Sequence, residues 1–266
     1  PIRDAVIEQT LRVYHQTKRI DMDVAILNWN AVLYREYRLV WPLAFGQASV
    51  SYDVPYGALT VGKDEMPGAA GERYYVENKE QRPRGIGTWL SATDNTDAVT
   101  ISSSVAVADY IDPTDQPAGY TILQPILLAS RRSCHPLGNE YIQPGDHYYH
   151  FSFTSHKAGN QIREKSGLSA NEELVAVYHP ETYAGVNLPE ELSFVSVDNP
   201  HTIITAFKKC EDDNSLILRL YNCSEQEQKV NLTLHVTPKQ IVKTNLIEEE
   251  TEAVDQIVLG KFAIET

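Results

Sequence analysis

The sequence has no run of about 18 apolar residues, so it predicts no membrane-spanning helix. It is also poor in cations, with 23 Lys and Arg against 36 Asp and Glu and a net charge of −13. Nucleic acids and anionic membranes attract Lys and Arg, so neither is expected as a partner. A charge of this sign keeps a protein soluble, and a neutral partner such as a sugar is compatible with it.

Cysteine is scarce as well, with three residues, an odd number for a disulfide framework. Cys210 and Cys223 flank a predicted hairpin and would lie roughly 25 Å apart at strand rise, and Cys134 is in another region. We therefore expect free thiols. The opening PIRDAVIEQT lacks the basic and apolar regions of a signal peptide and reads as part of a longer chain. Both features favour a location in the bacterial cytoplasm, although a leader could precede a missing domain.

What the sequence does have is alternation of apolar and polar residues, the period of β-strands. In RIDMDVAILNW, Asp21 and Asp23 fall on the face opposite the apolar positions, which are Ile20, Met22, Val24 and Ile26. Similar runs follow in YREYRLVWPLAF, ASVSYDVPYGAL, GTWLSATD, DAVTISSSVAVADY, TILQPILLASRR and HYYHFSFTSH. Pro125 predicts an edge strand, a bulge or a strand start in its run. Two long loops, 61–87 and 131–145, interrupt the pattern.

One short helix is predicted over SANEELVAVYH (Ser169–His179), with Ser169 or Asn171 as its cap. The regular pattern breaks after it, in HPETYAGVNLPEE, which predicts a domain boundary. The remainder reads as short strands with turns at DNP, EDDNS and SEQEQ, typical of a small sandwich. Composition and spacing therefore indicate an acidic, two-part, all-β protein.

Three histidines lie within ten residues of GDHYYHFSFTSHKAGN. If this run is a strand, His147 points away from the face that carries His150, and His150 lies about 20 Å from His156. Zinc ligands must converge to about 2.0–2.1 Å from one metal, so no metal site is expected here. A half-exposed strand with polar tips is the preferred interpretation.

Signatures of a nucleophile, a phosphate loop or a dinucleotide site are absent from the sequence. Neighbours such as Cys134 and His135 rarely align as nucleophile and base. A glycosidase with two catalytic carboxylates stays an open alternative at this point. Acidic residues are abundant, but nothing in the sequence singles out a pair.

The order of the segments resembles the C-terminal β-sandwich region of glycoside hydrolase family 38, the α-mannosidases. RIDMDVAILNW and YREYRLVWPLAF resemble the family's paired strands, and VSYDVPYGAL is similar to its Y-E-x-P-F/Y-G segment. GTWLSATDNTDAVTISSS matches a further segment, except that Ala98 stands where glycine is usual. SFVSVDNPHTIITAFKKCEDDNSLILRLYN is the most specific part and resembles the terminal segment that ends R-L-Y-N/E. The likeness covers nearly the whole chain.

This resemblance implies an antiparallel supersandwich like that of galactose mutarotases over 1–182, then one short helix and a small immunoglobulin-like sandwich over 188–266. It also implies that the chain is the non-catalytic part of a retaining, zinc-dependent α-mannosidase and is inactive alone. The catalytic barrel with its nucleophile and zinc, and a helical domain, would precede this chain in the same polypeptide. No catalytic residue, metal ligand or cofactor is therefore expected here. Family members often assemble as dimers, so a homo-oligomer is possible.

In the family, one sandwich loop helps to wall the sugar site, and the matching loop here follows LLASRR. The resemblance implies that α-mannosides would meet Arg132, His135, Asn139, Glu140 and Tyr141. An ordinary surface loop is the alternative for each of these residues, and Arg131 and Arg132 could instead form ion pairs with acidic loops.

Two other functions are weighed against this one. A stand-alone carbohydrate-binding module would use exposed aromatic residues, for which Tyr74, Tyr75 and Tyr141 are candidates. A mutarotase-like epimerase would need an acid and a base across a sugar ring, such as His147 or His150 with Glu140, but no spacing supports that pair.

Overall fold

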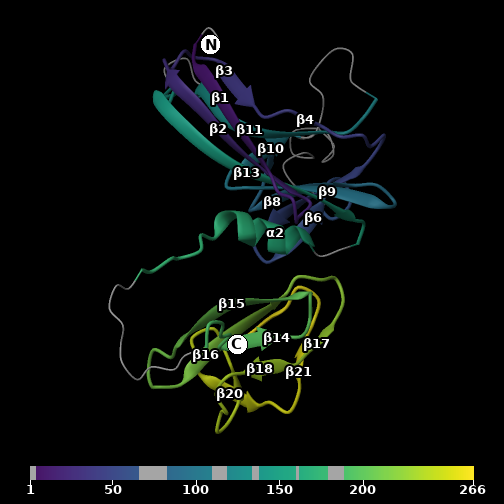
Figure 1. Cartoon of the computed structure of the whole chain (residues 1–266), viewed down its shortest axis with the longest axis vertical. Coiled ribbons are helices and arrows are strands. Elements are labelled where there is room, and N and C mark those ends of the chain that lie inside the picture. Colours follow the sequence, from purple (N-terminus) through teal and green to yellow (C-terminus); the bar gives the residue numbers. More distant parts are fainter. Residues whose placement is uncertain (1–3, 66–82, 110–118, 134–137, 160–161, 179–188) are drawn as a thin grey trace. The chain divides into compact units, whose positions relative to one another are not determined.

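The computed structural model describes residues 4–65, 83–109, 119–133, 138–159, 162–178 and 189–266. Its contacts divide the chain into two compact units, residues 1–173 and 174–266 (Figure 1). Residues 183–187, which separate the two predicted domains, lie outside the described residues. Both units are built from antiparallel sheets, so the all-β prediction is confirmed.

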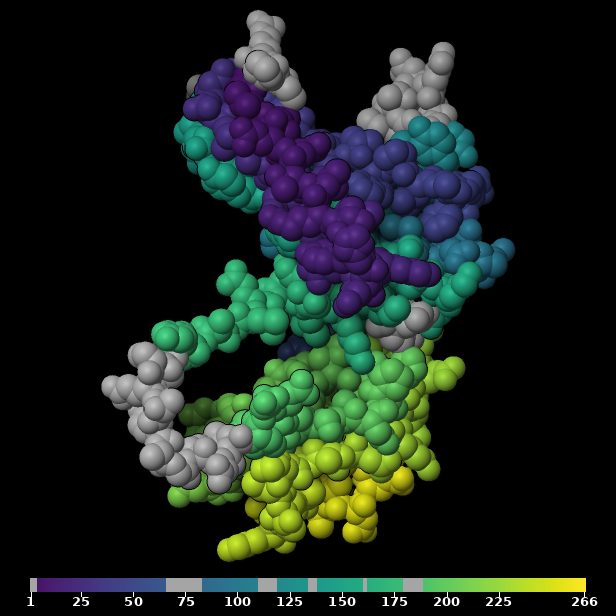
Figure 2. Space-filling model, viewed as in Figure 1, coloured from purple at the N-terminus to yellow at the C-terminus, as the bar shows by residue number. Residues whose placement is uncertain are grey.

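The first unit contains a seven-stranded sheet, in which neighbouring strands are antiparallel. Its spatial order is β1 (Val6–Val13), β2 (Arg19–Trp29), β13 (Gly145–Lys157), β9 (Asp97–Ser103), β8 (Trp89–Thr93), β5 (Ser49–Val54) and β6 (Gly57–Thr60). Edge strand β1 is exposed over most of its length, and Figure 2 shows it in purple on the surface of this unit.

A second sheet faces the first across the core. It contains β12 (Glu140–Tyr141), β11 (Ile122–Arg132), β10 (Val107–Asp109) and β7 (Arg84–Gly85), and β11 also pairs with β3 (Arg35–Arg38) and β4 (Trp41–Pro42). Pro125 lies buried inside β11, beside a register shift between Ile126 and Leu128. Of the three predictions for Pro125, the bulge is therefore the nearest.

The core lies on one face of the seven-stranded sheet, where alternate residues are apolar as the sequence pattern predicts. Phe151 and Phe153 of β13 are buried there, and the Phe153 ring stacks on Trp41 of the second sheet with centroids 3.6 Å apart. The other core side chains from the sheet include Met22, Val24, Val50, Tyr52, Leu90, Ala92 and Ile101.

The opposite face of the same sheet is polar and still largely buried. The register brings Ser91 beside both Ser51 and Thr100, and it brings Ser152 beside Asp21. All five side chains are at most 6% exposed. Short hydroxyl side chains pack closely in such positions and satisfy one another by hydrogen bonds, as between Thr100 Oγ1 and Ser91 Oγ at 3.0 Å.

Helix α2 (Ile162–Asn171) covers part of this polar face and packs against β8, β9 and β13. The contact is close because Gly167 has no side chain: a Cβ there would lie 2.3 Å from Thr88 Oγ1 and 3.0 Å from Trp89 Cδ1. The Arg163 guanidinium lies over the Trp89 ring, 4.7 Å from its centroid. No helix in the described ranges has the length and hydropathy to cross a membrane.

The helix prediction for Ser169–His179 is wrong in position, because the helix ends at Asn171. The Asn171 side-chain amide donates to the Gly167 carbonyl at 2.8 Å and so competes with the helical pattern. The apolar residues that suggested a helix, Leu174, Val175, Val177 and Tyr178, are at least 82% exposed in non-helical chain. Without a core to cover, their spacing does not sustain a helix.

The second unit is a small sandwich of short strands around Leu220, Val230 and Leu259. Its sheets pair β14 (Val195–Val197) with β18 (Leu232–Leu234), β15 (Thr202–Lys209) with β16 (Leu216–Asn222) and β22 (Ile264–Glu265), β17 (Gln228–Val230) with β21 (Ile257–Leu259), and β19 (Val242–Thr244) with β20 (Glu250–Ala253).

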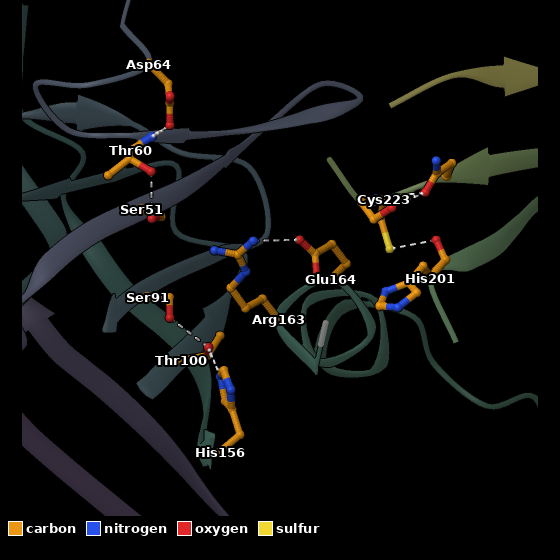
Figure 3. Close-up of polar contacts among 12 residues, drawn as sticks. Ser51, Thr60, Asp64, Ser91, Thr100, His156, Arg163, Glu164, His201 and Cys223 are labelled. Carbon is orange, nitrogen blue, oxygen red and sulfur yellow. Dashed lines mark hydrogen bonds and ion pairs between the residues drawn. The ribbon is translucent and has the colours of Figure 1, made fainter. Parts of the chain in front are cut away.

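Two buried side chains at the end of β16 connect the segments of this sandwich. The Asn222 amide donates to the carbonyls of Gln226, Leu259 and Gly260, and its oxygen accepts from Ser224. The thiol of Cys223 lies 3.0 Å from the His201 carbonyl oxygen (Figure 3). Neither Cys210 nor Cys223 takes part in a disulfide, as predicted, and Cys134 lies outside the described residues.

Candidate functional site

The residues expected to face a sugar lie on the hairpin of β11 and β12. Arg132 ends β11 and pairs in register with Glu140, the first residue of β12. The Ser133 amide donates to the Asn139 carbonyl at 2.9 Å, which closes the ladder beyond the strands. Asn139, Glu140 and Tyr141 therefore lie together with Arg132, whereas His135 falls within 134–137, outside the described residues.

The two charged members of this group bind each other. Arg132 Nη2 donates to Glu140 Oε1, and this hydrogen bond raises the pKa of the arginine. Each side chain keeps about two fifths of its surface in water. The ion pair predicted as an alternative for Arg132 thus forms, with a carboxylate of the same hairpin, and it fixes where both polar heads point.

A second set of charges supports the base of the hairpin. Glu36 of β3 accepts from Arg38 Nε at 2.5 Å and also from Arg131, the neighbour of Arg132 in β11. Arg38 reaches further to the buried carboxylate of Asp109 at 2.9 Å. Burial opposes the charge of Arg38, but the hydrogen bonds to Glu36 and Asp109 outweigh it and raise its pKa. The hairpin tip therefore rests on a connected set of ion pairs.

Tyr141 is the part of the hairpin most available to a ligand, because 59% of its surface is exposed. An exposed tyrosine ring beside fixed polar groups is a common way to bind a sugar, since the ring stacks on apolar C–H faces and the polar groups bind hydroxyls. The other aromatic candidates, Tyr74 and Tyr75, lie outside the described residues.

The three histidines of β13 have separate partners. His147 Nε2 lies 2.8 Å from the Gln143 carbonyl, His150 Nδ1 lies 2.7 Å from Asp23 Oδ1, and His156 Nε2 lies 2.8 Å from Thr100 Oγ1. Within the described ranges, no three His, Cys, Asp or Glu side chains are grouped so that they could hold a metal ion. The described residues thus offer no fit to the zinc that the resemblance implies.

The acid–base pair of an epimerase is not assembled by these contacts. Glu140 is held by Arg132 of its own hairpin, and His150 is held by Asp23 of β2. His147 is turned to the backbone at Gln143. Each group is bound to a different neighbour, and none of these contacts joins Glu140 to either histidine.

Sequence reasoning missed the hydroxyl-rich face of the seven-stranded sheet. Figure 3 shows part of it, where Ser91, Thr100 and His156 form a chain of hydrogen bonds beside Arg163 of α2. The signal was present in SVSYD, TWLSAT and TISSS, whose alternate Ser and Thr residues resemble solvent-facing positions. Nothing in the sequence indicated that this face would be covered.

A known family model matches part of the second unit. Residues 201–266 match the model for the glycosyl hydrolases family 38 C-terminal beta sandwich domain. No curated protein sequence matches the chain.

Among solved structures, the chain is similar to an alpha-mannosidase from Enterococcus faecalis V583, with a TM-score of 0.75 and 16% identity. It is also similar to a protein in the glycosyl hydrolase family 38 from Enterococcus faecalis, with a TM-score of 0.74 and 16% identity. Both matches cover 97% of this chain but only 28% and 29% of the other chains, so this chain spans less than a third of their length. Residues 201–266 therefore match the model of the family's C-terminal β-sandwich domain, and the chain as a whole has the fold of these two solved structures, in agreement with the sequence resemblance.

Proposed function

We propose that this chain is the C-terminal, non-catalytic part of a retaining, zinc-dependent α-mannosidase. The observation that carries this proposal is the family match of residues 201–266 together with a fold that covers 97% of this chain and 28% of an α-mannosidase. The nucleophile and the zinc would belong to a catalytic domain outside these residues, against which this part packs. Alone, the chain would not cleave glycosidic bonds.

The hairpin of β11 and β12 is the part of the chain that we propose to wall the sugar site. Tyr141 would offer its exposed ring to a sugar face, and the paired heads of Arg132 and Glu140 would offer fixed donors and acceptors to hydroxyls. Asn139 and His135 complete the proposed set. Because Arg132 and Glu140 neutralise each other, the hairpin suits a neutral α-mannoside better than an anionic one.

The first experiment is an assay of the 266-residue chain on an aryl α-mannoside, with and without added zinc. We expect no turnover in either case, and robust turnover would contradict the proposal. In the cells that make it, the native polypeptide should have a mass on the order of 100 kDa, because a barrel and a helical domain would add to the mass of this chain. A native species of 29.9 kDa would instead favour the binding-module alternative.

The hairpin role is tested in the longer native enzyme with Tyr141→Ala, against the control Tyr148→Ala. Tyr148 is also exposed, at 72%, but it lies on β13 of the other sheet. We expect Tyr141→Ala to raise KM several-fold and Tyr148→Ala to leave it unchanged. Equal effects of the two variants would remove the hairpin from the sugar site.

A carbohydrate-binding module remains the second candidate, because the exposure of Tyr141 suits it equally well. Titration of the 266-residue chain with manno-oligosaccharides separates the two functions. Saturable binding at millimolar or lower concentration that is lost in Tyr141→Ala would favour the module. Absence of binding would leave the hairpin dependent on the catalytic domain.

A further inference from the structure

A cavity of about 210 Å³ lies on the polar face of the seven-stranded sheet, and none of its described lining residues comes from β11 or β12. Strand residues form one wall, and the end of β13 with the start of α2 forms the other. Its lining consists of Ser49, Ser51, Thr60, Lys63, Thr93, His156, Gly159 and Arg163. The volume is below the range of about 300–1,000 Å³ of drug-sized pockets, so a ligand here must be small.

Two cations, Lys63 and Arg163, line this cavity. No hydrogen bond or ion pair holds the Lys63 ammonium among the described residues, and the Nε of Arg163 is buried without a hydrogen-bond partner. The nearest acidic contact of Arg163 is Glu164, at 3.5 Å. In a chain with 13 more acidic than basic residues, a cavity with two cations that form a single ion pair among the described residues is unexpected.

Two carboxylates of the neighbouring strands and turn, Asp53 and Asp64, are held by other groups. Asp53 accepts from both the amide and the hydroxyl of Thr88 at 2.7 Å, and Asp64 accepts from the Thr60 amide at 3.1 Å. Burial raises the pKa of Glu164, and its ion-pair partner Arg163 opposes that shift. Among the described residues, Glu164 is therefore the one carboxylate that pairs with either Arg163 or Lys63.

The rest of the lining supplies hydroxyl groups on a rigid frame. Ser51 Oγ and Thr60 Oγ1 lie 3.2 Å apart on paired strands, and Thr93 and Ser49 are neighbours in register on β8 and β5. His156 is fixed at both ring nitrogens, since Nδ1 donates to the Lys157 carbonyl at 3.0 Å while Nε2 contacts Thr100. The imidazole ring of His156 is thus held in place as part of the cavity lining. Figure 3 shows Arg163 reaching from α2 toward the strands that carry Ser51 and Ser91.

We propose that this cavity binds a monosaccharide-sized ligand that carries one oxyanion, either a phosphate or a carboxylate on a sugar. The guanidinium of Arg163 suits such an oxyanion because its planar donors match two oxygens at once, and Lys63 adds a mobile charge. The hydroxyls of Ser49, Ser51 and Thr93 then meet the sugar hydroxyls. This site stands independently of the α-mannosidase function and would be present in the chain alone.

The test is a calorimetric titration of the 266-residue chain. The titrants are glucose 6-phosphate, glucuronate, glucose and inorganic phosphate. We expect the phosphate and carboxylate sugars to saturate one site, inorganic phosphate to bind more weakly, and glucose not to bind at the same concentrations. The stronger of the two anionic sugars identifies the oxyanion. Equal binding of glucose would overturn the role of the cations, and no saturation by any of the four compounds would overturn the site.

The variants Lys63→Met and Arg163→Gln should each weaken binding of the anionic sugar at least tenfold. The control is Lys165→Met, which removes the same charge from an exposed position of α2. An equal loss in the control would show only general electrostatic attraction and would contradict the proposal. Because Arg163 also packs on Trp89, Arg163→Lys is the second variant: it keeps the charge and should restore part of the affinity.

The hydroxyl wall is tested with Ser51→Ala and Thr93→Val. These variants should weaken the binding of glucose 6-phosphate several-fold more than the binding of inorganic phosphate. Only the sugar has hydroxyl groups whose contacts with Ser51 and Thr93 are lost. Equal losses for both compounds would limit the site to the oxyanion and overturn the sugar part of the proposal.

Discussion

The two faces of the seven-stranded sheet differ in how they are buried. One face carries Phe151, Leu90 and Ile101 into an apolar core, and the other carries Ser91, Thr100 and Ser152, which are equally inaccessible to water. Apolar burial is non-directional and grows with area, whereas each buried hydroxyl needs a partner at a defined angle. The first face therefore provides stability, and the second provides fixed polar geometry on which a binding site can be built.

The largest effect on this comparison should come from Phe151→Ala, which removes a fully buried ring from the core face. We expect unit 1 to lose about 3–5 kcal/mol of unfolding free energy, from lost burial and the remaining cavity. Urea unfolding followed by tryptophan fluorescence measures it, because Trp29, Trp41 and Trp89 all lie in unit 1.

Thr154→Ala on the same strand is the matched control. Thr154 lies on the opposite face, is partly exposed and pairs in register with Thr100. Its replacement should cost less than about 1 kcal/mol. Comparable losses in the two variants would contradict the division of the sheet into two faces.

The next effect concerns Asp21, a buried carboxylate on the polar face. Burial alone would raise its pKa, but hydrogen bonds from Arg19, Ser152 and Tyr14 outweigh burial and lower the pKa from 3.8 to about 2. Stability from this group is therefore full above the unfolded value near 3.8, and it is lost as the pH falls toward 2. The contribution should be about 2 kcal/mol.

Asp21→Asn tests this dependence by urea unfolding at pH 5 and pH 2.5. The variant should lose about 2 kcal/mol at pH 5 and approach the wild type at pH 2.5. Asp97→Asn, which removes an exposed carboxylate paired with Lys157 on the same sheet, should change little at either pH. An equal difference in unfolding free energy between Asp21→Asn and wild type at the two pH values would contradict the lowered pKa of Asp21.

Gly167→Ala should change the unfolding free energy less, and in the direction opposite to the one expected in an exposed helix. In an exposed helix this exchange stabilises by about 1 kcal/mol. Here the new Cβ would meet Thr88 and Trp89, so we expect a loss of about 1–3 kcal/mol and looser packing of α2 on the sheet. Thermal unfolding compares it with Lys165→Ala, which should lie within about 0.5 kcal/mol of wild type. A stabilised Gly167→Ala would show that α2 does not lie this close to the sheet.

The smallest effect is expected at the hairpin, in the pair of Arg132 and Glu140. Both side chains are well exposed, so the ion pair should contribute between 0 and about 1 kcal/mol and fade with salt. A double-mutant cycle with Arg132→Gln and Glu140→Gln isolates this term. A coupling well above about 1 kcal/mol would indicate that the hairpin is a structural clamp rather than an exposed surface.

Strand positions could be predicted from the sequence because apolar alternation reports the core face directly. Asp21 and Asp23 fall opposite Met22 and Val24, as the pattern requires. The polar face could not be recognised as buried, because Ser and Thr at alternate positions look the same whether water or a helix covers them. Only the folded chain shows that α2 lies there.

The helix was misplaced for a related reason. Ser169–His179 offers caps and apolar spacing, whereas α2 has no apolar stripe and buries only Glu164 and Gly167. Its position follows from close approach at Gly167 and from Arg163 over Trp89, which are contacts between distant segments. The segment after LLASRR was predicted as a long loop, whereas Arg131 and Arg132 pair with Tyr141 and Glu140 in a hairpin. This pairing depends on register, which a single sequence does not specify.

The hydrogen bonds of the Asn222 side-chain amide have a consequence for how this protein can be produced. Asn222 and Asn231 each begin an Asn-x-Ser/Thr triplet that a eukaryotic secretory pathway recognises. Asn231 is exposed, but Asn222 is fully buried and gives its amide hydrogens to backbone carbonyls of its own sandwich. A glycan attached at Asn222 during synthesis would remove one of those hydrogens and block closure of the sandwich, so secretion from a eukaryotic host should yield folded protein only from chains that escape modification there.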